Sequence, residues 1–163
     1  MEVNCPVHGQ PQMPPLQIKV KRLTPTAILP TKAYAHDIGW DLYADASTSL
    51  IWAGPDWYVP PGHVLVISTG IAVEFPYGWG AYIRPRSSQG IKNIDIYGGV
   101  IDNGYRGELK VSVHNSSHLG VRYNPGDRVG QLVLTASPES VIIEVDELTQ
   151  TELQHNGHGS SGR

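Results

Sequence analysis

The stretch from Tyr97 to Val111 combines one acidic side chain with residues that let a backbone turn sharply. Asp102 lies between the pair Gly98-Gly99 and an Asn103-Gly104 turn, and Tyr105 follows directly after this turn. The strand-like runs on both sides of Asn-Gly predict a β-hairpin. Its mouth would offer backbone amides, one carboxylate and one aromatic ring to a nucleoside, although an ordinary hairpin with a solvated aspartate has the same pattern.

A second group of polar residues occupies the segment from Gly78 to Gly90. Arg86 carries a planar guanidinium fork that suits a phosphate, and Ser87 and Ser88 add hydroxyl and backbone N–H donors. Together they predict an anion-binding nest. A polar surface loop with an exposed arginine would contain the same residues, so the segment alone leaves both interpretations open.

Asp41 stands in the strand-like run 38–45. The alternation of polar and apolar residues predicts Asp41 and Asp45 on one face of this strand and Leu42 on the other. Asp41 would orient a metal-bound water or a neighbouring side chain, or it would be an exposed strand residue. The run by itself favours neither interpretation.

Another strand is predicted after Gly126. Gln131 lies within it and could reach a ligand, whereas Asp127 and Arg128 are predicted to form a structural pair at the preceding turn.

The two ends of the chain differ in composition from its middle. Residues 1–15 predict an irregular arm, in which Cys5 and His8 have a metal-binding spacing but no matching second pair, which favours a tail. Residues 149–163 end in a Gly- and Ser-rich run. This run would be a flexible arm, or a flap whose backbone amides close over a phosphate chain.

The elements between the two ends must position these groups. The 163-residue chain has 18 Gly and 13 Pro spread along its length, which leaves little room for long helices and predicts one all-β domain over residues 16–148. Strands are predicted over 16–21, 38–45, 63–75 with a bend at Gly70, and 140–148, and loops over 24–37 and 46–62.

The composition also limits the function. A net charge of −3 argues against direct binding of nucleic acid, which usually needs a basic face. The single Cys5 suits a reducing compartment, and no run of about 18 apolar residues predicts a membrane span. Without a signal-peptide pattern at its start, the chain is expected to be cytoplasmic, or in the host-cell cytoplasm if viral, and not secreted.

The order and spacing of these groups strongly resemble the five motifs of the homotrimeric deoxyuridine triphosphatases, the dUTPase family. The motifs are GWDLYAD at 39–45, RPRSSQG at 84–90, GGVIDNGYRGE at 98–108, GDRVGQL at 126–132 and GHGSSG at 157–162. The resemblance covers roughly residues 16–162. It implies an all-β, jelly-roll-like distorted β-barrel, a homotrimer with active sites between subunits, and a mobile C-terminal arm that reaches a neighbour.

The same resemblance implies hydrolysis of dUTP to dUMP and pyrophosphate with Mg²⁺, which keeps uracil out of DNA and supplies dUMP for dTMP synthesis. Asp102 matches the carboxylate that activates the water attacking the α-phosphate. Asp41 matches the acidic residue that organises the metal–water network. The metal is expected to be held by the triphosphate and waters, with no direct protein ligand and with Asp41 acting through water.

The other matched positions contact substrate in this family. Tyr105 matches the ring that packs on the deoxyribose and leaves no room for a 2′-hydroxyl. The remaining matches are Gly99, Val100, Ile101 and Lys110 in the uracil-binding hairpin, Arg86, Ser87, Ser88 and Gln131 at the phosphates, and His158 and Gly159 in the Gly-rich arm.

The chain departs from the family pattern in its C-terminal arm and in one insertion. An arginine usually precedes the Gly-rich run, but its position falls near Leu153, and His158 replaces a phenylalanine. His158 can still stack on uracil, whereas the missing arginine should weaken the grip on the γ-phosphate. The segment Ile51–Tyr58, with Trp52 and Trp57, is an insertion that would offer exposed aromatic area to a partner protein.

Two other functions remain open from the sequence. A dCTP deaminase shares the general fold, but it would need an additional acid or base group at the base edge, and the hairpin contains no obvious one. A nucleotide-gated regulatory protein would use the Ile51–Tyr58 segment as its contact and is compatible with catalysis.

Overall fold

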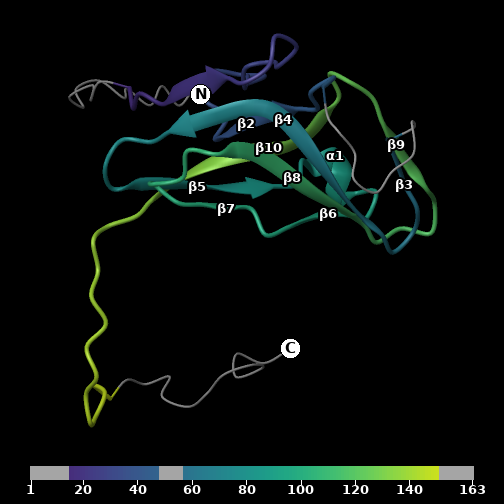
Figure 1. The fold of residues 1–163 in the computed structure, drawn as a ribbon. Coiled ribbons are helices and arrows are strands. Elements are labelled where there is room, and N and C mark those ends of the chain that lie inside the picture. The colour runs from purple at the N-terminus through teal and green to yellow at the C-terminus, as the bar shows by residue number, and fades with distance from the viewer. Residues whose placement is uncertain (1–14, 48–56, 151–163) are drawn as a thin grey trace, which may run out of the picture.

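Two four-stranded antiparallel sheets form the body of the protein (Figure 1). The computed structural model describes residues 15–47 and 57–150. The first sheet has the order β1 (Lys19–Arg22), β4 (Val64–Glu74), β8 (Glu108–Asn115), β6 (Ile94–Tyr97). The second has the order β2 (Gly39–Tyr43), β10 (Arg128–Ala136), β5 (Trp79–Arg84), β7 (Val100–Ile101). A short ribbon of β3 (Trp57–Val59) and β9 (Val121–Tyr123) and one helical turn, α1 (Ser87–Gly90), complete the described part, which confirms the all-β prediction.

The core lies between the sheets because their strands alternate buried apolar and outward-facing residues. Alternation is clearest in β8, where Leu109, Val111 and Val113 are buried and the residues between them face outward. Every strand of the second sheet except the two-residue β7 contributes at least one fully packed side chain, such as Leu42, Ile83 and Leu132. These strands also carry the candidate site residues, so the packed core fixes the site's framework.

Gly70 bends β4, as the sequence predicts. Its φ is +65°, and the pairing of β4 with β8 shifts register between Ser68 and Ala72. A Cβ at this position would come within 2.8 Å of the Asp45 carboxyl carbon and of the Thr24 hydroxyl. Only glycine therefore suits both the backbone conformation and the space.

The carboxylate of Asp45 is buried, although the alternation of the run 38–45 predicts it on the same face as Asp41. The prediction is wrong because the chain leaves the second sheet after Tyr43. The Asp45 carboxylate accepts hydrogen bonds from the hydroxyls of Thr24 (2.9 Å), Thr26 (2.6 Å) and Ser47. It ties the loop before β2 to the end of that strand.

The strands around Asn103-Gly104 do not pair with each other, so the predicted hairpin across this turn is wrong. β7 pairs with β5 in the second sheet, whereas β8 pairs with β4 and β6 in the first. The hairpin is formed instead by β6 and β8, with Tyr97 opposite Ser112. Residues 98–107 form its long loop, and β7 within this loop crosses to the other sheet.

Residues 137–150 contain no strand, which corrects the prediction for 140–148. Val141, Ile142 and Ile143 are exposed, and this segment runs away from both sheets as extended chain (Figure 1). The apolar pattern is strand-like, but a strand needs a neighbour to pair with, and the described part of this chain offers none.

The first strand lies at 19–22, slightly later than predicted, and residues 24–37 form the expected loop. Trp57 is buried in the core and pairs with Tyr123 across the β3–β9 ribbon, so it is not part of an exposed aromatic surface. None of the helical structure in the described residues is long and apolar enough to cross a membrane.

Candidate active site

A cavity of about 400 Å³ opens where the beginning of β2, the α1 turn and β10 meet. Its walls bring together five residues that the sequence places in three separate motifs: Asp41, Arg86, Ser87, Ser88 and Gln131. Asp37, Ile38, Gly39 and Ala33 complete the lining. The antiparallel register explains the meeting, because Gln131 of β10 pairs with Asp41 of β2 on one side and Arg84 of β5 on the other.

Asp41 is the centre of a charged network in this cavity. One oxygen of its carboxylate accepts a hydrogen bond from Arg86 Nε at 2.7 Å, and the other accepts one from Arg128 Nη1 at 3.2 Å. The Asp41 side chain is only 13% exposed and the Arg86 side chain 24%, so solvent screens this pair weakly. Arg86 Nη1 also donates to Ser88 Oγ at 3.4 Å, and the remaining terminal N–H groups of Arg86 can donate to an anion.

The predicted pair of Asp127 and Arg128 does not form. Asp127 accepts hydrogen bonds from the backbone and side-chain nitrogens of Asn124, while Arg128 reaches Asp41. Asp127 belongs to the turn before β10 and caps it, whereas Arg128 is the first residue of the strand and faces β2, so the two neighbours take different partners. Arg128 was therefore missed as a member of the candidate site.

Gln89 holds the α1 turn against β10, a role that the sequence did not predict. Its side-chain oxygen accepts the Arg86 backbone N–H at 2.9 Å, and its Nε2 donates to the Val129 carbonyl at 3.0 Å and to Tyr123 Oη at 3.4 Å. Gln89 is 6% exposed. A glutamine three residues after the start of a short turn is a capping-box signal that could have identified it.

Burial raises the pKa of Tyr123, and the nearby Asp127 carboxylate raises it further, while the hydrogen bond from Gln89 opposes these effects. The phenol therefore stays neutral over the physiological range and remains a suitable partner for the Gln89 amide. This buried contact fixes where Ser87 and Ser88 stand in the cavity wall.

Gln131 is held in place from two directions. Its Nε2 donates to the Pro85 carbonyl at 2.9 Å. A Cβ at position 39 would overlap the Gln131 amide, so Gly39 provides the space that this side chain occupies. Gln131 is thereby fixed in the wall of the cavity, next to Asp41.

Asp102 and Tyr105 lie in the loop after β7. Asp102 is exposed, and its carboxylate makes no hydrogen bond or ion pair with the described part of the chain. The Tyr105 hydroxyl donates to the Glu108 carbonyl at 2.9 Å, and its ring covers Gly107. Two hydrogen bonds shape the loop: Asn103 Nδ2 donates to the carbonyls of Pro76 (2.8 Å) and Trp79 (2.7 Å).

The edge strand β7 carries Val100 and Ile101, with Gly99 directly before it. The Gly99 carbonyl accepts the Ile83 N–H at 2.7 Å, and β7 pairs only with β5. Because β7 ends the sheet, its outer row of peptide groups faces away from any strand of the described part. Lys110 lies on β8 in the other sheet, 3.7 Å from a Glu108 oxygen.

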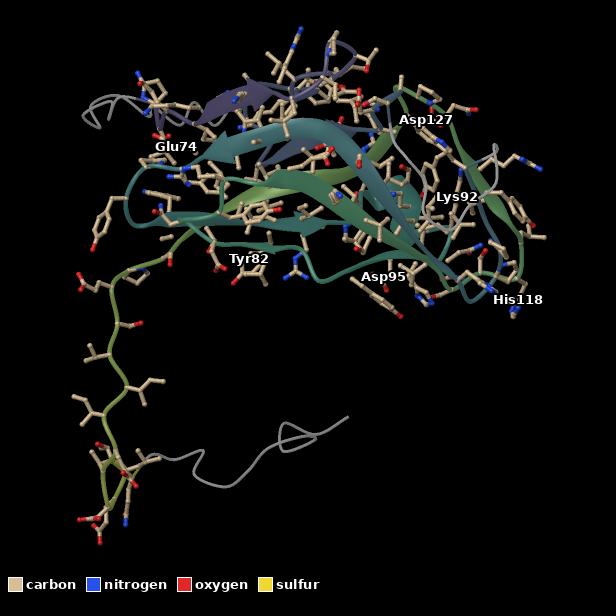
Figure 2. The ribbon with its side chains drawn as sticks, viewed as in Figure 1. Glu74, Tyr82, Lys92, Asp95, His118 and Asp127 are labelled. Carbon is tan, nitrogen blue, oxygen red and sulfur yellow. The ribbon has the colours of Figure 1, made fainter. Side chains whose placement is uncertain are left out.

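The two groups of candidate residues lie at different parts of the second sheet. β2 and β7 are its opposite edges, three strand spacings or about 14 Å apart. Ile101 pairs with Ala81, three residues from Arg84, which adds about 10 Å along the strands. In Figure 2, Tyr82, which pairs with Val100, and Asp127, next to Arg128, lie in different parts of the molecule. Asp102 is thus roughly 17 Å or more from Asp41.

Some predicted positions lie outside the described residues. These are His158 and Gly159 of the Gly-rich arm, Trp52 of the insertion, and Cys5 and His8 near the beginning.

Comparison with known proteins places this chain in a family. Residues 26–162 match the family described as dUTPase. The chain belongs to the dUTPase family. The deoxyuridine 5'-triphosphate nucleotidohydrolase of Gloeobacter violaceus is 35% identical over 153 residues, which cover 92% of this chain and 99% of that relative.

Solved dUTPases share the fold. The dUTPase of Staphylococcus bacteriophage 80alpha, solved with dUPNHPP, has a TM-score of 0.77 and 24% identity, covering 90% of this chain and 99% of that one. A mutant dUTPase from phage phi11 of S. aureus, described with a structural Mg(II) ion, has a TM-score of 0.68 and 22% identity, covering 80% and 97%. The first of these is described as controlling transfer of virulence genes.

Proposed function

We propose that this dUTPase-family chain hydrolyses dUTP to dUMP and pyrophosphate. One observation carries the proposal: the fold gathers Arg86, Ser87, Ser88, Gln131 and Asp41 from three motifs around one cavity. A guanidinium with free donors, two hydroxyls and an amide match the oxygens of a phosphate chain. The name of the Gloeobacter relative supplies the matching substrate.

Uracil is selected by the backbone of β7 and the segment before it. An edge strand offers alternating N–H and C=O groups, and the base edge of uracil pairs with such a pattern where cytosine does not. Tyr105 packs against the sugar and leaves no room for a 2′-hydroxyl. Lys110 completes this part of the site from β8.

Asp102 is the general base that takes a proton from the attacking water. Its carboxylate is exposed and engaged by no partner in the described chain, so its lone pairs are able to accept that proton. The water attacks the α-phosphorus, and the bond to the bridging oxygen of the leaving pyrophosphate breaks. Arg86 stabilises the charge that builds on this leaving group.

The oxygen-rich cavity suits Mg²⁺. Asp37, Asp41 and Gln131 present oxygen atoms there, which are the ligands this ion prefers. Both Asp41 oxygens already accept arginine N–H groups, so Asp41 would hold the ion through water, as the triphosphate supplies most ligands. Bound Mg²⁺ would neutralise triphosphate charge.

One complete site needs more than one copy of the chain. The separation of roughly 17 Å or more within one chain is too long for Asp102 to activate a water at a phosphate held by Arg86. A neighbouring subunit of a homotrimer would bring its own Asp102 and Tyr105 to the Arg86 cavity. The Gly-rich arm, with His158 stacking on uracil and Gly159 near the phosphates, would close the site.

Pyrophosphate release from dUTP, dCTP, dTTP and UTP, measured with and without Mg²⁺, tests this function. Fast, Mg²⁺-dependent release from dUTP alone is expected. Release from none of the four would contradict the proposal, and ammonia release from dCTP would replace it with a deaminase. In either location expected from the sequence, the cell or host-cell cytoplasm, the enzyme would act on the nucleotide pool.

A further inference from the structure

The side-chain amide of Asn103 lies in the loop after β7, between Asp102 and Tyr105. Its Nδ2 donates one hydrogen bond to the Pro76 carbonyl at 2.8 Å and one to the Trp79 carbonyl at 2.7 Å. Asn103 is half-buried, whereas its neighbours on both sides are exposed. Asn103 is therefore the residue of this loop tip that the protein encloses most.

The two acceptors belong to the turn between β4 and β5. The Trp79 N–H donates to the Pro76 carbonyl at 3.2 Å, and Gly78 has a φ of +78°, which suits the third position of a type II turn. The Ser137 N–H donates to the Gly78 carbonyl at 2.7 Å, which ties the turn to the segment after β10. Asn103 thus attaches the loop to a turn that is itself hydrogen-bonded on both sides.

The other side chains of the loop make mostly local contacts. Arg106 Nη1 donates to the carbonyls of Asn103 (2.6 Å) and Tyr105 (3.0 Å), and the Tyr105 hydroxyl donates to the Glu108 carbonyl. Arg106 Nε also lies 3.8 Å from a Glu74 oxygen, but these two side chains are 50% and 42% exposed, so water and salt weaken the pair. Within the described chain, the Asn103 amide is the strongest polar side-chain link between this loop and a distant segment.

The backbone just before Asn103 is fixed by the sheet. Ile101 pairs with Ala81, and a Cβ at Gly80 would lie 2.9 Å from the Ile101 carbonyl oxygen, so β5 and the end of β7 lie in close contact. The Asp102 carboxylate has no partner in the described chain. Its position therefore depends on the two attachments of its backbone, the sheet on one side and the Asn103 amide on the other.

We propose that Asn103 is a positioning residue, whose amide holds the loop after β7 in the arrangement in which Asp102 and Tyr105 act on the nucleotide. This inference rests on the proposed function, because it concerns the same loop. Asn103 acts through its neighbours and not through contact with the substrate. A group that faces two carbonyl oxygens must donate twice, which an amide nitrogen does, whereas a carboxylate donates to neither.

Kinetics of two variants at this position test the role. N103D places a carboxylate oxygen against two carbonyl oxygens, so the loop should separate from the turn and kcat for dUTP should fall by about 10–100-fold. N103A removes the donor without adding repulsion, and its kcat should fall by only about 3–10-fold. Affinity for inorganic pyrophosphate, a probe of the distant Arg86 cavity, should stay within about twofold of the unmodified chain in both variants.

Asn115 provides a matched control. Its Nδ2 also donates to two backbone carbonyls, those of Val59 (2.9 Å) and Leu119 (2.7 Å), and Asn115 is fully buried. It ends β8, about 24 Å along the strand from Glu108, where the loop joins this strand. N115D should lower the midpoint of unfolding at least as much as N103D, but kcat per folded molecule should stay within about twofold. N115S replaces N115D as the control if N115D does not fold.

Hydrogen exchange gives a readout that does not depend on activity. The Tyr105 N–H donates to the Asp102 carbonyl at 3.1 Å, so its exchange rate, measured by NMR, reports whether this turn stays closed. Exchange at Tyr105 should be faster in N103D and unchanged in N115D. A kcat for N103D within about twofold of the unmodified chain, or an equal loss of kcat per folded molecule in N103D and the Asn115 control, would overturn the inference.

The inference and the proposed function can fail separately. Absence of dUTP hydrolysis in the unmodified chain would overturn the proposed reaction, and faster exchange at Tyr105 in N103D would still support the attachment of the loop by Asn103. Normal dUTP hydrolysis in the unmodified chain, with unchanged exchange at Tyr105 in N103D, would keep the reaction and overturn the positioning role.

Discussion

The carboxylate in the Asp41 cavity and the carboxylate in the loop after β7 differ in burial and in hydrogen bonding. Asp41 is nearly buried, and each of its oxygens accepts a hydrogen bond from an arginine. Asp102 is exposed and has no partner in the described chain. Asp41 lies in the edge strand β2 of the second sheet, and Asp102 directly follows its opposite edge strand, β7.

The difference separates two tasks. A group that positions cations for a polyanion works best when it is rigid and fully hydrogen-bonded before the ligand arrives. A general base must keep a lone pair for the water it activates. Under the proposed function, the cavity would be the prepared binding half and the loop the reactive half, and in one chain the two halves would lie too far apart to act together.

The largest loss of activity is expected from substituting one residue in each of these two regions. D102N should lower kcat by about 10²–10⁴-fold while nucleotide binding and folding remain, because the amide cannot accept the proton. R86Q should also be nearly inactive, through lost phosphate contacts. Steady-state kinetics and dUMP binding measure the two defects.

Mixing the two variants then tests whether a site is shared. Refolding D102N with R86Q together should restore part of the activity, since some sites would combine an intact Arg86 from one subunit with an intact Asp102 from another. Each variant refolded alone is the control. No recovery in mixed oligomers, verified by differential tags, would place both residues in the same subunit's site.

A smaller effect, on stability, is expected from substituting the glycines directly before β7. In G99A, a Cβ would lie 2.7 Å from the Ile83 carbonyl oxygen at a φ of +83°, so the free energy of unfolding should fall by about 3 kcal/mol. Gly98 has a φ of +69° with nothing within 4 Å. G98A should therefore cost only about 1 kcal/mol.

Denaturant unfolding of G99A and G98A gives the comparison. The same strain should weaken dUMP binding in G99A more than phosphate binding, because the Arg86 cavity lies elsewhere on the sheet. Equal losses of stability in the two variants would show that the close approach to Ile83 is not a constraint.

The smallest effect is expected from substituting Asp45, whose hydrogen bonds stabilise the end of the strand that carries Asp41. Burial alone raises the pKa of Asp45, but hydrogen bonds from Ser47, Thr26 and Thr24 outweigh it and hold the pKa below its ordinary value. A lowered folded-state pKa stabilises the fold at pH values above the unfolded pKa of about 3.9, and this stabilisation is lost as the pH falls through the folded value. D45N should cost about 2 kcal/mol at pH 7.

The difference between D45N and the unmodified chain should shrink below about pH 4. Hydrogen exchange would locate the loss of stability, with β2 amides losing protection in D45N before those of β7. A difference that stays constant down to the acid-unfolding limit would mean that the charge of Asp45 contributes nothing.

Much of the candidate site could be predicted from local sequence. The types and spacing around Arg86, Asp102 and Tyr105 indicated phosphate binding, a base and a sugar-packing ring, and Gly70 indicated the bend of β4. These signals are local because each depends on what a residue can donate, accept or adopt in φ and ψ. Their roles in catalysis stay predictions.

Pairing across distance could not be predicted in the same way. Arg128 looked like the partner of Asp127, but it donates to Asp41, which is 87 positions away in the sequence. The loop around Asn103-Gly104 looked like the turn of a hairpin, but its flanking strands belong to different sheets. Residues 140–148 looked like a strand, but the described chain supplies no neighbour for it.

The sequence by itself determined the all-β class, the family and the residue types of both halves of the site, because strand periodicity, turn residues and motif spacing are local properties. Tertiary structure alone decided that Asp41 joins Arg86 to Arg128, that Gln89 fixes the α1 turn, and that Asp102 follows the edge strand farthest from Asp41 in the same sheet. These relations arise from strand register and sheet order, which depend on packing between segments distant in the chain.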